Sequence, residues 1–349
     1  MLALLALPAK ADWLTEEMTE ALDVSALEET AEDLGLDFAC ASRDSGEAFE
    51  AILRGALKVC LPKETLARTA ACLTVVLFCG LLRNSFGIGG SRLDVLSLCG
   101  AAAVTALTMG GAEAVVSVGT EALRKAQDVS NALLPTLSTA ALLSGEITAA
   151  AAKYTAAAFF LNILTNLCVD GVIPVVSFYC AAAAAETVCS EVMSGVLGFL
   201  KWCVTMLLTV LLLSFTIWLG VSGTVSGTAD AAVLRGAKTT ISTVLPLVGS
   251  IASDAAASVL SAAAALRQQL GVFGLLLIAA ALLLPFLRIG AQYLLMKGAA
   301  AVSGGLGDAK LKKLMERNTE ALGMLLGCLG ACGLMLFFSV FSLMKVSIP

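Results

Sequence analysis

The residues of this 349-residue chain that could do chemistry are a few ionisable side chains inside or beside long apolar stretches. An ionised group at the centre of a bilayer is costly, so such groups usually pair with one another or mark a path for ions or solutes. The chain has no histidine, which excludes histidine-based catalysis and histidine metal sites. We therefore expect no enzyme activity and no catalytic, metal or cofactor site, but a set of intramembrane polar or pathway residues. These candidates are Glu113, Glu146, Lys153, Asp170, Glu186, Asp254, Arg267 and Arg288.

Two of these acids follow prolines at similar distances, which suggests a shared site. Glu146 lies 11 residues after Pro135, and Asp254 lies 8 residues after Pro246. In helical segments, the difference of three residues places both acids on nearly the same face of equivalent helices. One interpretation is that both acids point into an interface between helices, where they line a wet path or pair with a basic side chain. The other interpretation is that each charge lies at the membrane–water boundary and only ends a span.

The elements that must position these charges are apolar helices. The chain is 58% hydrophobic and 14% charged, whereas a soluble domain is about 45–50% apolar and about 25% charged. So much apolar surface requires a bilayer as solvent, and a helix needs about 20 apolar residues to cross it. We therefore predict an all-α polytopic membrane protein with seven to nine membrane helices or half-helices. The stretches without a charged residue are 69–82, 95–112, 129–145, 154–169, 171–185, 202–229, 239–253, 268–287 and 321–344.

An internal duplication is predicted to organise these helices into two copies, 93–190 and 196–298. The stretches ALRKAQDVSNALLP (122–135) and VLRGAKTTISTVLP (233–246) share a basic turn, an apolar stretch and a final proline, 111 residues apart. Repeats of this kind are frequent in transporters, where the pathway lies between the copies. The alternative is a duplicated, pseudo-symmetric bundle without any pathway. The next proline pair keeps the offset, so the prolines expected to kink helices are Pro135, Pro174, Pro246 and Pro285.

The remaining segments differ in charge and therefore in expected location. Residues 1–11 are predicted to be a vestigial or truncated signal segment, with a short apolar core and an Ala-x-Ala ending. Residues 12–62 form an acidic helical segment that we expect outside the cytoplasm, either as a solvated face or as a surface that docks a partner. Residues 63–92 hold the first membrane helix and its flanks. Residues 299–320 are predicted to be a basic cytoplasmic loop, and 321–349 the last membrane helix.

The second copy, and to a lesser extent the first, carries residues that match a known family. In the second copy they are Lys238, Pro246, Gly249, Ser253, Asp254, Val259, Gly271, Gly274, Pro285, Ile289 and Lys297. In the first copy they are Leu133, Leu134, Pro135, Asn162, Pro174, Ser190 and Glu191. With this pattern, which covers about residues 100–300, the chain resembles the stage III sporulation protein AE family.

The resemblance implies a membrane subunit of the channel between mother cell and forespore, a secretion-like or feeding apparatus required for endospore development. It implies a multi-pass protein of the mother-cell membrane around the forespore. The implied partners are other stage III sporulation membrane and ring-forming proteins, their ATPase and the lipid bilayer, with no nucleic acid and no cofactor. The alternative is an autonomous secondary transporter, or permease, for a small solute built from the internal repeats.

Overall fold

The chain is described by a computed structural model whose described part is helical and contains no strand. The described residues are 24–34, 45–59, 63–86, 92–144, 147–187, 189–244, 249–306 and 309–344. The side chains of residues 222–262 lie outside this description. The helices are α2 (Val24–Asp33), α4 (Ser45–Val59), α5 (Lys63–Phe86), α6 (Arg92–Leu143), α7 (Ile147–Asn166), the π-helix η3 (Leu167–Val172), α8 (Ile173–Glu186), α9 (Ser190–Val244), α10 (Gly249–Leu306) and α11 (Ala309–Met344).

Six helical segments in the described part are long and apolar enough to cross a membrane, which makes this a multi-pass membrane protein. The sequence predicted seven to nine membrane helices or half-helices, and this number stays a prediction, because the side chains of stretch 239–253 lie outside the description. In the structure, stretches 95–112 and 129–145 fall on one helical span, and so do 154–169 and 171–185. Charged residues do not by themselves end a helix, since the backbone hydrogen bonds are unaffected. The six segments are Lys63–Arg83, Val95–Leu143, Ala150–Glu186, Val192–Val221, Ala263–Gly304 and Ala309–Met344.

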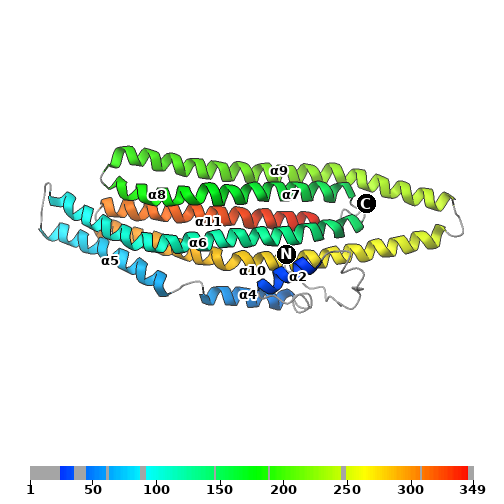
Figure 1. Cartoon of the computed structure of the whole chain (residues 1–349), viewed down its shortest axis with the longest axis horizontal. Coiled ribbons are helices and arrows are strands. Elements are labelled where there is room, and N and C mark those ends of the chain that lie inside the picture. Colours follow the sequence, from blue (N-terminus) through cyan, green and yellow to red (C-terminus); the bar gives the residue numbers. More distant parts are fainter. Residues whose placement is uncertain are drawn as a thin grey trace.

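The helices form an elongated bundle in which α11 occupies the middle (Figure 1). Helix α11 contacts α6, α7 and α8, which lie in the first predicted copy, and α9 and α10, which lie mainly in the second. Each predicted copy folds as two long helical segments: α6 with α7–η3–α8, and α9 with α10. The duplication itself stays a prediction. What the structure adds is that the last helix, outside both copies, fills much of the space between them.

Close approach of α10 and α11 depends on glycines of α11. A Cβ atom at Gly323 would lie 3.4 Å from the ring of Tyr293, and one at Gly333 would lie 3.4 Å from a methyl group of Leu282. Without side chains at these positions, the two helices approach closely enough for dispersion contacts along their length. This agrees with the density of small residues in the sequence, which is typical of tightly packed membrane helices.

The four prolines do not act alike. Pro135 and Pro285 lie inside continuous α-helices, α6 and α10, whereas Pro174 is at the start of α8, directly after η3. Proline has no N–H, so Pro174 cannot donate to the carbonyl four residues earlier. The chain passes this point in π-helical register, with the Ile173 N–H bonded to the Cys168 carbonyl. Pro246 lies outside the described residues.

Two of the predicted segments can be compared with the helices. The predicted loop 299–320 is helical in its described part, because α10 continues to Leu306 and α11 begins at Ala309. The acidic segment 12–62 contains the helices α2 and α4, and α2 packs against α6 while α4 packs against α10. Residues 1–11 lie outside the described residues.

Candidate functional site

Two of the predicted polar residues, Lys153 and Arg267, meet at the C-terminal end of α11. Arg267 of α10 is fully buried and Lys153 of α7 is 5% exposed. The Arg267 Nε donates to the carbonyl of Leu343, and its Nη1 donates to the Ser144 hydroxyl at 3.1 Å. The Lys153 ammonium donates to the carbonyl of Ser342 at 3.0 Å. We call these two side chains the C-terminal cation pair.

The C-terminal cation pair has a clear structural role. The last carbonyls of a helix have no partner within the helix, and they carry the negative end of the helix dipole. Cations bound there satisfy those carbonyls and are themselves stabilised. The hydrogen bonds join α6, α7 and α10 to the end of α11. This favours an anchoring role for Lys153 and Arg267 over a place along an open path.

A second, partly buried cluster surrounds Arg317, near the other end of α11. The guanidinium of Arg317 binds the Glu186 carboxylate with two hydrogen bonds, Nε–Oε2 at 3.0 Å and Nη2–Oε1 at 3.1 Å. Its Nη1 also donates to Glu320 at 3.0 Å. The Glu186 side chain is only 3% exposed. We call this group, with the residues that complete it, the Arg317 network.

Three further side chains complete the Arg317 network from three helices. Lys313 of α11 lies 2.9 Å from Glu186, and Lys201 of α9 lies 2.7 Å from Glu320. The buried Tyr179 of α8 donates its hydroxyl to Glu320. Each carboxylate therefore has two basic partners, which offsets the large desolvation cost of burying it.

The sequence analysis missed most of this network. It included Glu186 among the candidates but treated Arg317 only as part of a basic loop, and it did not single out Glu320 or Tyr179. A usable signal was present: Arg317 and Glu320 are three residues apart, at the border of the charge-free stretch 321–344. Residues three apart share a helix face, so an acid and a base there indicate an internal pair at the end of a span.

The two clusters lie at the two ends of the apolar part of α11. Glu320 and Leu343 are 23 residues apart, about 35 Å along a helix with a rise of about 1.5 Å per residue. The hydrocarbon core of a bilayer is about 30 Å thick. On the neighbouring α9, two exposed tryptophans, Trp202 and Trp218, are 16 residues apart, or about 24 Å, as expected for interfacial aromatic belts. Both clusters therefore lie close to the membrane boundaries.

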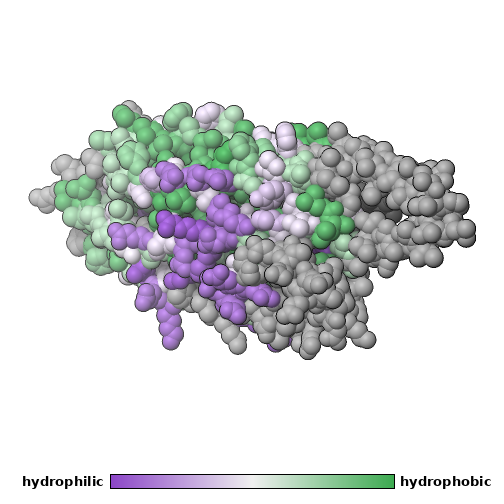
Figure 2. Space-filling model, turned by 45° about the vertical axis from the view of Figure 1, so that its right-hand side comes forward, coloured by the Kyte–Doolittle hydropathy of each residue, from purple (hydrophilic) through white to green (hydrophobic). Residues whose placement is uncertain are grey.

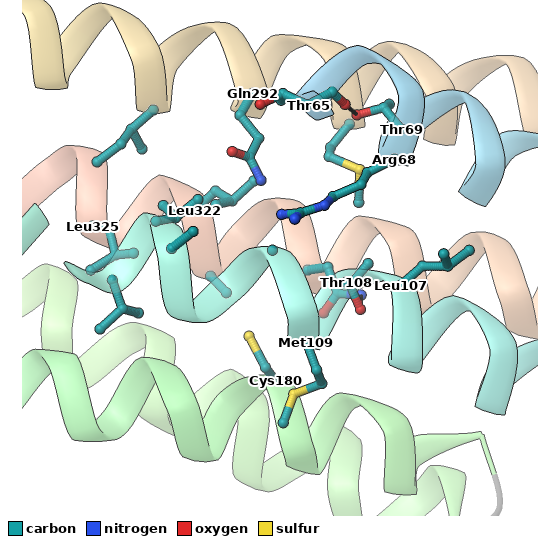
Figure 3. A pocket seen from close by; sticks show the side chains of 18 of the residues that line it. Thr65, Arg68, Thr69, Leu107, Thr108, Met109, Cys180, Gln292, Leu322 and Leu325 are labelled. Carbon is teal, nitrogen blue, oxygen red and sulfur yellow. Dashed lines mark hydrogen bonds between the residues drawn. The ribbon is translucent and has the colours of Figure 1, made fainter. Parts of the chain in front are cut away.

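A cavity of about 110 Å³ lies between α5, α6, α8, α10 and α11. Figure 3 shows Arg68 of α5 and Gln292 of α10 reaching into it from different helices. The Nη1 of Arg68 donates to the Gly110 carbonyl at 3.3 Å. A Cβ at Gly111 would lie 3.4 Å from this Nη1, so the glycine makes room for the guanidinium. Arg288 and Asn318 also line the cavity. Glu64 lines it as well, 4.0 Å from Arg68. With two cationic groups against one carboxylate, the cavity suits a small anion or ordered water.

The other predicted residues are separated from these clusters. Glu113 on α6, Asp170 in η3 and Arg288 on α10 are exposed. Asp254 lies on α10, but its side chain is outside the description, and Glu146 lies outside the described residues. The shared site of Glu146 and Asp254 therefore stays a prediction. Among the described residues, no three histidine, cysteine or acidic side chains form a group that could hold a metal ion.

Comparisons with known proteins agree with the resemblance noted from the sequence. The model of the family described as "Stage III sporulation protein AE" matches residues 82–347. A relative described as "Stage III sporulation protein AE" from Bacillus subtilis (strain 168) is 22% identical over 235 residues. The aligned part is 67% of this chain and 59% of the relative, so the chain spans less than two thirds of the relative's length. No solved structure matches the chain.

Proposed function

The chain belongs to the stage III sporulation protein AE family, and from this premise we propose that it is a membrane subunit of the channel joining mother cell and forespore during endospore development. Family membership supports a role in sporulation, and the six candidate spans place the protein in a membrane. The observation that carries the proposal is the match of the family over 82–347, which includes five of those spans completely. The bundle then serves as a structural component that works with other stage III membrane and ring-forming proteins and their ATPase.

The experiment that tests this role is purification from sporulating cells of the native host. A tagged copy of the full chain is extracted in mild detergent at the stage when the forespore is engulfed. The proposal expects co-purification of other stage III sporulation proteins in fixed proportion. A tagged multi-pass protein of the same membrane, unrelated to sporulation, is the control. Recovery of the chain alone, at a yield that shows intact protein, would reject the channel-subunit role.

A second candidate function is an autonomous transporter for a small anionic solute. The cavity lined by Arg68, Arg288, Gln292 and Glu64 supports it, because its two cationic groups outnumber its one carboxylate, which suits an anion. The isolated protein in liposomes distinguishes the two functions. The transporter is supported if the liposomes take up an anion and if this uptake is lost in the Gly111→Leu variant, whose uncharged side chain fills the cavity. Absence of uptake, with the stage III proteins co-purifying, supports the channel subunit.

The proposed orientation places the N-terminal end of α11 in the cytoplasm of the mother cell and the acidic segment 12–62 in the space between the cells. Lys310, Lys312, Lys313 and Arg317 make residues 306–318 strongly basic, and basic segments near spans stay on the cytoplasmic side. We predict that Ala309→Cys resists a membrane-impermeant thiol reagent in intact cells. Ala51→Cys, on the exposed surface of α4, should react in intact cells before engulfment is complete, while the space between the two cells is still open to the medium.

The two positions control for one another, because both side chains are exposed in the structure. Labelling is read at each peptide by mass spectrometry, so the native cysteines need not be removed. Lysed cells should label both positions. Reaction of Ala309→Cys and protection of Ala51→Cys in intact cells would reverse the orientation.

A further inference from the structure

One exposed side of α6 carries a run of polar and charged residues. The residues are Glu113, Ser117, Glu121, Arg124, Lys125 and Asp128, and all are exposed. Their spacing of three, four or seven residues keeps them on one side of the helix, over about 22 Å. Glu121 and Lys125 form an exposed ion pair at 2.9 Å. We call this set the polar face of α6.

The polar face of α6 lies at the depth of the apolar part of α11. Near its start, the Asn318 amide of α11 donates to the Thr108 hydroxyl of α6 at 3.4 Å. Further along, Leu133 of α6 lies against Gly274 of α10, close to the part of α10 that contacts the end of α11. Residues 109–132 of α6 therefore run beside the charge-free residues of α11. A membrane that covers α11 also covers the polar face.

The opposite side of the bundle at the same depth is apolar. Leu208 of α9 lies against Gly327 of α11, which places the two helices in register. Large apolar side chains of α9 are exposed on either side of this point. They include Phe199, Trp202, Met206, Val210, Leu213 and Ile217. Figure 2 shows the same contrast: the upper part, where α9 lies, is hydrophobic, and hydrophilic residues gather in the middle and lower part of the view.

Lipid cannot cover both sides. A charged side chain at the centre of a membrane helix costs about 2.5–3.5 kcal/mol even on insertion scales that give low values. Five charges on one exposed face would make a lone chain in lipid strongly unfavourable, even with one internal ion pair. Charged residues within membrane segments are tolerated where they face water or protein. The polar face therefore needs water or protein against it, whereas α9 suits acyl chains.

We propose that the polar face of α6 borders a water-filled path through the membrane, closed by further copies of this chain. Each copy then has a lipid-facing side, α9, and a water-facing side, α6, which is what a closed ring of identical subunits requires. The polar face carries acidic and basic residues together, so identical neighbours do not repel as faces of a single sign would. The cavity at Arg68 adjoins this face, because Gly111, Ala114 and Val118 of α6 line it.

The proposal concerns Glu113 directly, a residue that the sequence analysis included among the pathway candidates. It differs from the path first considered, which ran between the two predicted copies, where α11 now lies. It rests on the proposed channel role but is tested on the isolated chain. Failure here would therefore leave co-purification with the stage III proteins as a separate question.

The experiment compares two exposed positions at one depth, Ser117→Cys on the polar face and Val210→Cys on α9. The full chain with each substitution is reconstituted in vesicles of phosphatidylethanolamine and phosphatidylglycerol. It is then treated with a charged thiol reagent or with a neutral, membrane-permeant maleimide. Reaction is read at the substituted peptide by mass spectrometry. Because thiolate in water is the reactive form, Ser117→Cys should react with the charged reagent at least about tenfold faster than Val210→Cys. Val210→Cys should be slow with both reagents in vesicles, and it should react with the maleimide once the protein is unfolded in detergent, which shows that its thiol is intact.

Three results would overturn the proposal. If Ser117→Cys and Val210→Cys are equally slow with the charged reagent, the polar face is not in contact with water. If Ser117→Cys resists both reagents, protein covers the face. A bifunctional thiol reagent should also join copies through Ser117→Cys. Ser117→Cys could also react with the charged reagent while no homo-oligomer is cross-linked or found by native mass spectrometry. In that case the water-filled path is not closed by further copies of this chain.

Discussion

The two ends of the apolar part of α11 hold buried charge in different ways. At one end, the Arg317 network opposes acids with bases: Glu186 and Glu320 each contact two basic side chains. At the other end, Lys153 and Arg267 donate to backbone carbonyls of Ser342 and Leu343, where the helix dipole is negative. Both clusters tie α11 to its neighbours near a membrane boundary.

The difference predicts how each end fails. Removing one member of an ion pair leaves a buried charge without its partner, which is strongly destabilising. Removing a cation from helix carbonyls leaves neutral acceptors and no unpaired charge, so less is lost. The Arg317 network should therefore be the more fragile of the two ends.

The largest effect is expected from Arg317→Met. The Glu186 side chain is only 3% exposed, and it loses the guanidinium that binds it with two hydrogen bonds. Glu320 loses one of its two basic partners. We expect a loss of about 3–5 kcal/mol in the free energy of unfolding, the range for breaking a buried pair. The measurement is denaturation in mixed detergent micelles, followed by circular dichroism.

Two variants control this prediction. Lys312→Met, on the same helix, removes an exposed pair with Glu316 at 3.6 Å and should cost less than about 1 kcal/mol. The double variant Glu186→Gln with Arg317→Met removes both charges, so it should be more stable than the sum of the single effects predicts. Additive losses would show that Glu186 and Arg317 are not coupled.

A smaller effect is expected from Arg267→Met at the C-terminal cation pair. The substitution removes the hydrogen bonds to the Leu343 carbonyl and the Ser144 hydroxyl. A hydrogen bond to a charged group contributes about 1.5–3 kcal/mol to the free energy of unfolding. We expect a loss in this range, by the same denaturation measurement. Arg267→Lys keeps the charge and should recover part of it. A loss larger than that of Arg317→Met would contradict the comparison of the two ends.

The smallest effect is expected from Tyr179→Phe. The ring stays in its buried place, and only the hydroxyl that donates to Glu320 is lost. Glu320 keeps Lys201 and Arg317 as partners. We expect a loss of about 1 kcal/mol, the usual net contribution of one hydrogen bond. An unchanged denaturation midpoint would place this tyrosine outside the network in energetic terms.

Much of the fold could be predicted from local features, and parts of the site could not. Charge-free stretches located the spans, but they did not show that the stretches on either side of Asp170, and on either side of the charges in 113–128, belong to continuous helical segments. The candidate charges included Lys153, Arg267 and Glu186, all of which are buried. The spacing of charges could not show their partners, since Glu186 meets Arg317 from 131 residues away.

The sequence by itself determined the solvent of this protein, the approximate position of its membrane helices and its family. Hydropathy and helix length are local properties, so they can be read along the chain without knowing which helices are neighbours. Only the tertiary structure decided the surroundings of each described charge. Lys153 reaches a carbonyl 189 residues further along the chain, and Glu113 stays on an exposed face. Whether a charge is anchored or exposed depends on which helices pack around it. That depends on contacts between distant residues, which side-chain shape and helix packing determine.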